Sequence, residues 1–124
     1  MNRFRKNEHL CSKKQIETLL TQGEWFFVFP LKICYRFQTE TAAAPCLSVV
    51  AVPKRYFKKA VARNLLKRRM RESFRLHKHD LYAALAARNQ SLYVFLQYAH
   101  EEALPYAQIE NAMKKTLEKL IGYI

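Results

Sequence analysis

Residues 54–79 read KRYFKKAVARNLLKRRMRESFRLHKH and contain eleven of the chain's 22 lysines and arginines but only one of its ten acids, Glu72. This segment carries a formal charge of +10, so the other 98 residues share only +2 of the net +12. Charge concentrated in one short segment is typical of a surface that binds a polyanion.

The same segment predicts an amphipathic helix that begins near Ala60. At about 100° per residue, a drifting row of bases faces away from an apolar arc, with Phe74 at the boundary. Arg69 falls inside the apolar arc, so we expect its side chain to reach solvent or to bind an acid or a carbonyl group. The basic row is Lys59, Arg63, Lys67, Arg71 and Arg75, with Arg68 and Lys78 beside it, and the apolar arc is Ala62, Leu65, Leu66, Met70, Ser73 and Leu76.

The basic row carries a single sign of charge. A solvated face is the commoner meaning of a charge run, but four like-charged pairs spaced four residues apart would cost roughly 1–2 kcal/mol together. Phosphate groups of a partner would offset this repulsion, and arginine binds them through paired hydrogen bonds. An anionic membrane is a poorer partner, because the apolar arc is needed to cover the strands.

Hydrophobic periodicity on both sides of the basic segment predicts the other elements. Leu31 to Phe37 alternates apolar with polar residues, which predicts a strand with one solvent-facing side, and Pro30 indicates a bulge or an edge position. The order is helix, strand, strand, helix, strand, helix, with 25–37 counted as one strand or two. We therefore expect an α/β (α+β) two-layer sandwich, a small mixed sheet with helices on one face. The expected elements are a helix at 13–22 with Ser12 as N-cap and Gly23 at its end, strands at 25–37, 47–52 and 91–98, a loop at 38–45, and a helix from Pro105 to Gly122.

Length and composition favour one domain over residues 1–124, since half of the residues are hydrophobic and can form a core. No apolar run approaches the roughly 18 residues of a membrane span, and the charged N-terminus lacks the apolar stretch of a signal peptide. Cys11, Cys34 and Cys46 are widely spaced and odd in number, so we expect neither a disulfide framework nor a structural zinc site. We therefore expect a cytoplasmic protein with no membrane partner.

No group of residues matches a protein active site, so we expect no catalytic residue. The chain has two glycines, which excludes a glycine-rich phosphate loop. The ten acids are scattered, and no pair is placed to hold two metal ions for hydrolysis. His77 and His79 beside Asp80 suggest a nuclease, but residues two apart on a helix point away from each other.

Aromatic residues crowd the predicted strands. We expect most of them in the core, and one or two on an open sheet face would stack on unpaired bases. They are Trp25, Phe26, Phe27, Phe29, Tyr35, Phe37, Tyr93, Phe95 and Tyr98.

The motif Arg63-Asn64-x-x-Lys67-Arg68-x-x-Arg71-Glu72-x-Phe74, with the preceding strand and turn in SVVAVPKRYFKKAVARNLLKRRMRESF, resembles the signature region of the bacterial ribonuclease P protein component. RFRKNE near the start, the short helix ending in Gly23, the strand SLYVFLQY and the last helix follow in that family's order. The resemblance covers most of the chain. It implies that the basic helix forms the crossover of a left-handed β-α-β unit.

The resemblance implies the accessory subunit of a ribonucleoprotein endoribonuclease, in which the RNA removes the 5′ leader of precursor tRNA with Mg2+. The protein would bind the catalytic RNA through the basic helix, hold the single-stranded leader in a cleft between that helix and the sheet, and help the site to bind Mg2+. No metal site on the protein and no obligate protein partner is identified. Carried over by position, the RNA-binding residues are Lys54, Arg55, Arg63, Asn64, Lys67, Arg68 and Arg71, to which the basic row adds Lys59 and Arg75.

Three positions depart from the family pattern. The family's usual arginine two places after Arg63 is Leu65, and the glycine common before the basic helix is Lys58. The first helix carries aliphatic residues such as Ile16 where the family often has aromatic residues of the cleft. Tyr35 is the candidate that replaces them as a leader contact, although its apolar neighbours on the strand favour burial.

Two other functions stay open. A structural RNA-binding protein of ribosomal or nucleoid type fits the composition equally well, and only the motif distinguishes it from a ribonuclease P protein. A nuclease that acts without RNA would require His77 or His79 to be essential.

Overall fold

The computed structural model describes residues 13–38 and 46–124. The N-cap at Ser12, the RFRKNE stretch and the loop at 39–45 lie outside these ranges and stay predictions. The elements are α1 (Lys13–Gln22), β1 (Glu24–Val28), β2 (Leu31–Gln38), β3 (Cys46–Ala51), α2 (Ala60–His77), α3 (His79–Ala87), β4 (Ser91–Tyr98) and α4 (Tyr106–Gly122).

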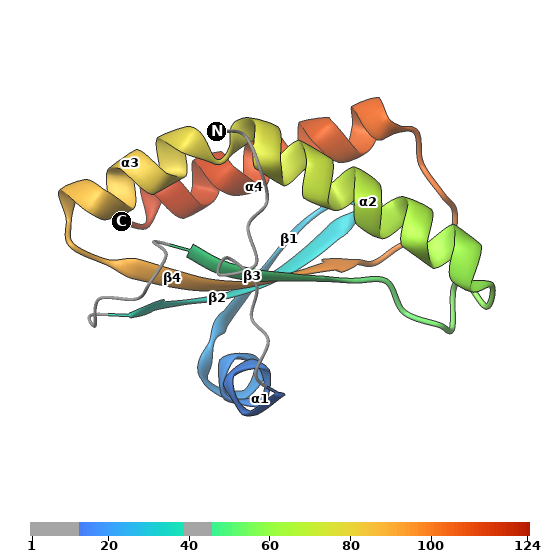
Figure 1. The fold of residues 1–124 in the computed structure, drawn as a ribbon, viewed down its shortest axis with the longest axis horizontal. Coiled ribbons are helices and arrows are strands. Elements are labelled where there is room, and N and C mark those ends of the chain that lie inside the picture. Colours follow the sequence, from blue (N-terminus) through green and yellow to red (C-terminus); the bar gives the residue numbers. More distant parts are fainter. Residues whose placement is uncertain (1–12, 39–45) are drawn as a thin grey trace.

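The strands form one mixed sheet in the order β1-β2-β4-β3. β2 is antiparallel to both β1 and β4, whereas β3 and β4 are parallel and are joined by α2 and α3. In Figure 1, β3 runs to the right in front, α2 and α3 return above the sheet, and β4 runs to the right behind β3. The crossover is therefore left-handed, as the resemblance implied, against the strong right-handed preference of such units.

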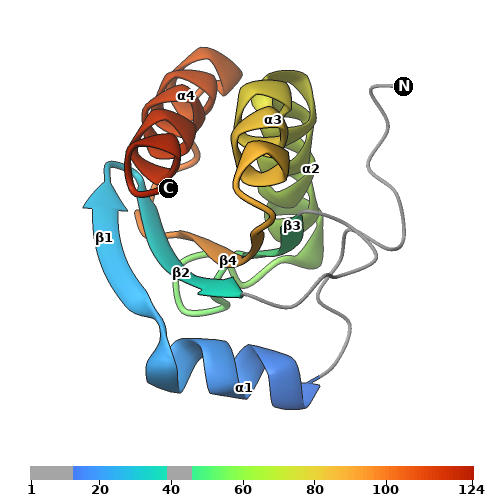
Figure 2. The same ribbon diagram turned by 90° about the vertical axis from the view of Figure 1, so that its left-hand side faces the viewer.

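The helices lie on both faces of the sheet. α2, α3 and α4 cover one face, and α1 lies across the other (Figure 2). The prediction that the helices share one face is wrong for α1, because its apolar stripe packs on the side of β2 that alternation marked as solvent-facing. There Leu19 and Cys34 are both buried, and the Cys34 thiol donates a hydrogen bond to the Leu19 carbonyl at 3.3 Å.

Gly23 makes this packing of α1 possible. Its amide donates to the Leu19 carbonyl at 2.7 Å, so the prediction that it ends α1 is confirmed. A Cβ at this position would lie 2.5 Å from the Leu19 oxygen, 2.6 Å from the Cys34 sulfur and 2.9 Å from the Tyr35 oxygen. The glycine is needed for this close approach, since its φ is not positive.

The other predicted boundaries hold within one or two residues, with two exceptions. The run at 25–37 is a hairpin of β1 and β2, and Pro30 lies in its turn, not in a bulge or on an edge strand. α3 was missed, because its nine residues follow the basic helix after only Lys78 and bury just Leu81 and Leu85. Asn89 reverses the chain after α3 with a φ of 50°, a conformation that asparagine tolerates well.

The main core lies between the sheet and the α2–α4 layer. α2 contributes Leu66, Met70, Ser73 and Phe74, all of which are buried. Phe74 is therefore a core residue and not a boundary one, and Leu76, expected in the apolar arc, is 39% exposed. No helix in the described ranges combines the length and the apolar character that a bilayer crossing needs.

Candidate nucleic-acid interface

The outer face of α2 and the turn before it present most of the predicted RNA-binding residues to solvent. Within the described ranges, the side chains of six of them have no hydrogen bond or ion pair, so their donors are available to a ligand. Arginine and lysine donors without an internal partner are suited to phosphate oxygens. Lys54, Lys59, Asn64 and Arg68 are exposed, and Lys67 and Arg71 are half-buried.

Two of the remaining predicted RNA-binding residues have partners inside the fold. Arg63 donates through Nη1 to the carbonyl oxygens of Phe57 and Lys58, both at 2.8 Å, and so holds the turn that leads into α2. Arg75 forms an ion pair with Glu72, one turn back on the same helix. These contacts reduce the like-charge repulsion that the sequence predicted along the row, and they leave fewer free cations than the nine residues suggest.

The guanidinium of Arg55 and the ammonium of Lys78 lie over aromatic rings. Arg55 is exposed, and its guanidinium carbon is 4.8 Å from the Tyr56 ring centre. Lys78 was placed beside the basic row, but it is only 4% exposed, and its Nζ lies 5.2 Å from the Tyr82 ring centre. Arg55 therefore stays in the interface, whereas Lys78 belongs to the packing between α2 and α3.

Arg69 meets the expectation for a base inside the apolar arc. Its Nη1 donates to the Leu104 carbonyl at 2.9 Å, which ties α2 to the segment before α4. The Tyr98 hydroxyl fixes the same segment, because it donates to the Glu102 carbonyl at 2.6 Å and accepts from the Leu104 amide at 3.0 Å. Burial raises the pKa of Tyr98. Arg69 is thus a structural residue and not part of the interface.

The histidines proposed for a protein nuclease do not converge. The imidazole Nε2 of His77 lies 2.9 Å from a carboxylate oxygen of Glu110 on α4, and this hydrogen bond lowers the pKa of Glu110. His79 begins α3 and is exposed. In the described part of the chain, no three His, Cys, Asp or Glu side chains gather as a metal site would require.

The cleft that the resemblance implied between the basic helix and the sheet is filled. Leu66, Met70 and Phe74 occupy the space between α2 and the strands, and each is at most 1% exposed. Since side chains of the core take this volume, an RNA strand does not fit there. The open surface lies on the opposite side of the sheet, beside α1.

That open face carries aromatic and basic side chains together. Trp25 pairs in register with Cys34 and Phe27 with Lys32, so these four side chains share a face. Trp25 is 43% exposed and Phe27 53%. The Lys32 ammonium lies 4.9 Å from the Trp25 ring centre, and Trp25 meets the ring of Phe95 edge-on at 6.3 Å. Exposed rings beside cations are the surface that unpaired nucleotides use.

A pocket of about 240 Å3 continues this face beneath α1. Lys14 of α1 and Arg36 of β2 bring positive charge to it, and Tyr93 of β4 brings an aromatic ring. Sequence reasoning missed Lys14, Lys32 and Arg36 as ligand groups. For Lys32 and Arg36, the alternation with apolar residues along β2 was a usable signal, because the outward positions between Leu31 and Phe37 are these two bases and Cys34. The full lining is Lys14, Gln15, Thr18, Leu19, Arg36, Gln38 and Tyr93.

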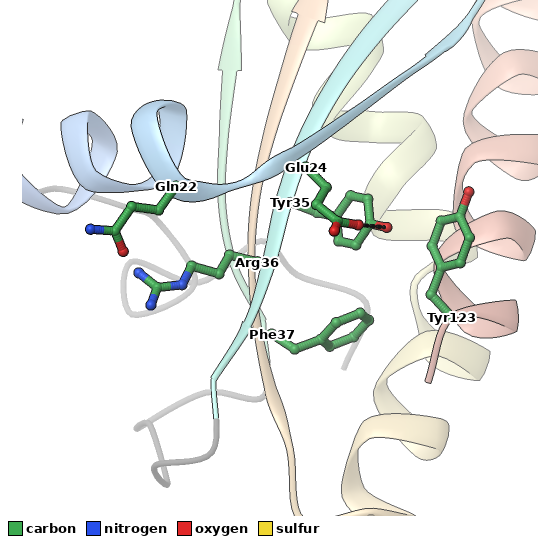
Figure 3. A pocket seen from close by; sticks show the side chains of 6 residues that line it. All are labelled: Gln22, Glu24, Tyr35, Arg36, Phe37 and Tyr123. Atoms are coloured by element: carbon green, nitrogen blue, oxygen red, sulfur yellow. Dashed lines mark hydrogen bonds between the residues drawn. The ribbon is translucent and has the colours of Figure 1, made fainter.

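Tyr35, the candidate leader contact, lies on the covered face of the sheet (Figure 3). Its side chain is 8% exposed, and its ring stacks on Tyr123 with a centroid distance of 5.2 Å. The hydroxyl donates to Glu24 at 3.0 Å, and burial, followed by this hydrogen bond, raises the pKa of Tyr35 to about 12. Tyr35 is therefore buried, and the aromatic residues on the open face are Trp25, Tyr93 and their neighbours.

Comparisons with known proteins identify the family and the fold of this chain. The family model described as Ribonuclease P matches residues 4–121. A protein of Porphyromonas gingivalis named Ribonuclease P protein component is 34% identical over 119 residues, which span 96% of this chain and 87% of that protein. A solved structure of the Staphylococcus aureus RNase P protein has a TM-score of 0.73 at 19% identity, over 92% of this chain and 95% of that one. Another from the same organism has a TM-score of 0.67 at 18% identity, over 96% and 93%.

Proposed function

The chain belongs to the ribonuclease P protein family, and from this premise we propose that it is the RNA-binding subunit of ribonuclease P. In this role it binds a catalytic RNA and the 5′ leader of precursor tRNA, and it assists the endonucleolytic removal of that leader. The RNA carries the catalysis. The observation that carries the proposal is the outer face of α2, where the motif residues Asn64, Lys67, Arg68 and Arg71 stand without a partner in the described ranges.

We assign the catalytic RNA to the outer face of α2. The helix is held rigidly from beneath, because its inner face is part of the core and Arg69 ties it to the segment before α4. Arg63 fixes the turn at 57–58 through two carbonyl groups, so Lys54 and Arg55 are presented by a braced loop. Rigid placement of the cations lowers the entropy that would be lost when phosphates bind.

We assign the leader to the open face of the sheet. An unpaired strand offers phosphates and exposed base faces, which suit a surface of aromatic rings flanked by cations. Trp25 and Tyr93 supply rings, and Lys14, Lys32 and Arg36 supply charge. The two RNA surfaces then lie on opposite sides of the sheet, so both strands bind at once without competing for the same groups.

Mg2+ is required by the RNA and not by a site on the protein. Among the described residues, no three His, Cys, Asp or Glu side chains gather into a group that could hold a metal ion, so this proposal assigns no Mg2+ ligand to the protein. The contribution of the protein is to bind and orient the leader on the open face, so that the phosphate to be cleaved is held at the RNA active site.

The proposal is tested by reconstitution with the cognate catalytic RNA at low Mg2+. We expect the purified protein alone to leave precursor tRNA intact, and the protein with the RNA to restore cleavage under physiological salt. The matched control is the Arg68→Ala/Arg71→Ala double variant, which keeps the core and removes two free cations. Cleavage by the protein alone, after stringent removal of contaminating RNA, would refute the assignment of catalysis to the RNA.

The structural RNA-binding alternative predicts a different result in the same assay. A ribosomal or nucleoid component would bind RNA but would not change the rate of leader removal at any Mg2+ concentration. Affinity without stimulation would therefore replace the proposed function by this alternative.

A further inference from the structure

A second pocket, of about 400 Å3, opens where β2 extends beyond β1. Glu24, the first residue of β1, pairs with Tyr35, so Arg36, Phe37 and Gln38 have no strand partner among the described residues on the β1 side of β2. This leaves a notch in the edge of the sheet that connects its two faces. The volume lies within the range of roughly 300–1,000 Å3 that is usual for small-molecule sites.

Aromatic rings form the pocket wall on the covered side of the notch. Tyr123, directly after α4, is 48% exposed and stacks nearly parallel, within 5°, on the buried ring of Tyr35. Phe37 meets Tyr35 edge-on at 5.7 Å and is half-buried. In Figure 3, the rings of Tyr35, Phe37 and Tyr123 lie on the same side of β2. A ring held by a buried neighbour is a pre-ordered surface for a flat ligand.

Glu24 supplies a fixed acceptor beside these rings. The Tyr35 hydroxyl donates to one of its carboxylate oxygens at 3.0 Å, which orients the carboxylate toward the pocket. A carboxylate has about four acceptor positions, and the described residues occupy only one of them. The remaining acceptor positions are available to the N–H or O–H donors of a ligand.

Arg36 and Gln22 lie on the other side of the notch. Figure 3 shows both side chains on the side of β2 opposite to the three rings. Neither has a hydrogen bond or an ion pair with another described residue. Arg36 also lines the pocket beneath α1, so it stands between the open face and the notch. A guanidinium in this position is suited to a phosphate group.

We propose that this notch binds one unpaired guanine nucleotide, with its phosphate on Arg36 and Gln22 and its base against Tyr123 and Phe37. The Watson–Crick edge of guanine presents two adjacent donors, N1–H and the N2 amino group, and a carboxylate accepts such a pair through both oxygens. Adenine and cytosine present a donor beside an acceptor, and uracil presents one donor between two acceptors. Glu24 therefore discriminates for guanine, and the stacking surface adds affinity for any base.

The continuity of Arg36 with the open face favours a nucleotide that belongs to an RNA strand. A strand that lies along the open face would place its next phosphate on Arg36 and turn its base through the notch. Free guanine nucleotides share the same chemistry. Binding of this nucleotide is a property of the protein alone, so it can be measured without the catalytic RNA and does not depend on any effect on leader removal.

The test titrates the 15N-labelled protein with the pentanucleotides UUGUU, UUAUU and UUIUU, in which inosine lacks the N2 amino group, and with free GMP. We expect UUGUU to bind about tenfold more tightly than UUAUU, with UUIUU in between, and to shift the amide signals of Phe37 and Tyr123. Tighter binding of UUGUU than of GMP assigns the notch to an RNA strand, and equal binding assigns it to a free nucleotide. Equal affinity for UUGUU and UUAUU, or shifts confined to residues outside the notch, would overturn the proposal.

Matched variants separate the groups of the site. Glu24→Gln keeps an acceptor for the Tyr35 hydroxyl, so we expect a folded protein that has lost the preference for guanine over adenine. Tyr123→Ala should weaken all the pentanucleotides by roughly 5- to 150-fold, the range for one lost stack, while Tyr123→Phe keeps the affinity. Arg36→Ala should weaken binding more than Arg88→Ala, which removes the same charge from the end of α3. A Glu24→Gln protein that retains the full preference for guanine would show that the carboxylate does not read the base.

Discussion

The two faces of the sheet are built for different purposes. Under α2, α3 and α4, the strands bury most of their side chains, and Leu31, Ile33, Leu92, Val94 and Leu96 have no exposed surface at all. On the side of α1, the buried cluster among the described residues consists of Leu19 and Cys34, and the apolar residues packed around it are partly exposed. Apolar burial is the main source of stability, so most of the folding free energy comes from the first face.

The second face is less buried and leaves large aromatic rings accessible to solvent. Exposed Trp25 and Phe27 contribute little to folding, yet they lie beside Lys32 on a surface open to solvent. Large exposed apolar groups rimmed by charge usually mark a binding surface. We therefore expect substitutions on the covered face to change stability and, under the proposed function, substitutions on the open face to change RNA binding.

The largest expected effect is on the covered face. Met70→Ala should lower the free energy of unfolding by about 2–5 kcal/mol, because Met70 has no exposed surface and its removal leaves a cavity. Urea denaturation measures the change. Leu76→Ala on the same helix is the control and should cost much less, since Leu76 is 39% exposed. Similar losses for the two variants would mean that the inner face of α2 is not packed as described.

Gly23→Ala tests how α1 is attached to the open face. The added Cβ meets the Leu19 oxygen at 2.5 Å and the Cys34 sulfur at 2.6 Å, so we expect a loss of about 1–3 kcal/mol, as for other overpacked sites. Urea denaturation and the reactivity of the Cys34 thiol report it. Burial raises the pKa of Cys34 to about 11, which keeps the thiol protonated and unreactive near neutral pH. Gly122→Ala is the control, because a Cβ there meets nothing within 4 Å, and it should leave the free energy of unfolding equal or slightly higher. A destabilised Gly122→Ala variant together with a stable Gly23→Ala variant would show that the close approach at Gly23 does not limit the packing of α1.

Trp25→Ala separates stability from leader binding. In the reconstituted complex, affinity for precursor tRNA should fall by about 1–3 kcal/mol, the value of one lost stack, while affinity for mature tRNA, which has no leader, barely changes. Trp25→Phe keeps a ring and should retain most of the affinity. A large fall in melting temperature with an unchanged ratio of the affinities for precursor and mature tRNA would show that Trp25 has a structural role and does not bind the leader.

The outer face of α2 should respond to salt. Each of Lys67→Ala and Arg68→Ala should lower the slope of log K against log salt by about 0.7–0.9 for binding of the catalytic RNA, without loss of stability. Arg75→Ala is the informative control, because Arg75 is paired with Glu72 and should change the slope less. An unchanged slope in the double variant would mean that this face is merely solvated.

The smallest expected effect concerns the pair of His77 and Glu110, which joins α2 to α4. The hydrogen bond from His77 lowers the pKa of Glu110 below its ordinary value of 4.5. The stabilisation is therefore present above that value and is lost as the pH falls through the lower folded pKa. Between pH 6 and pH 3, the free energy of unfolding should fall less steeply for Glu110→Gln than for the unchanged protein, and parallel curves would show that the pair does not couple to folding.

Much of the fold and part of the interface could be predicted from residue patterns. The two-faced α2, the strand at 91–98 and the helix at 13–22 follow from periodicity that local chemistry enforces, and the motif residues Lys67 and Arg68 are on the outer face as expected. α3 escaped because nine residues give too short a pattern to separate from the helix before it. Lys14, Lys32 and Arg36 escaped because they come from two elements, and only the folded sheet brings them to one surface.

The sequence by itself determined the family, most of the helices and strands, and the concentration of positive charge in one segment, because charge and hydrophobic period are properties of neighbouring residues. The tertiary structure alone decided which side of the sheet stays open. Alternation marks two faces of a strand, but it does not say which helix covers which face, since that depends on long-range packing such as α1 over Cys34. For the same reason, only the fold revealed that Arg63 and Arg75 are occupied by internal partners and that the space beneath α2 is core and not cleft.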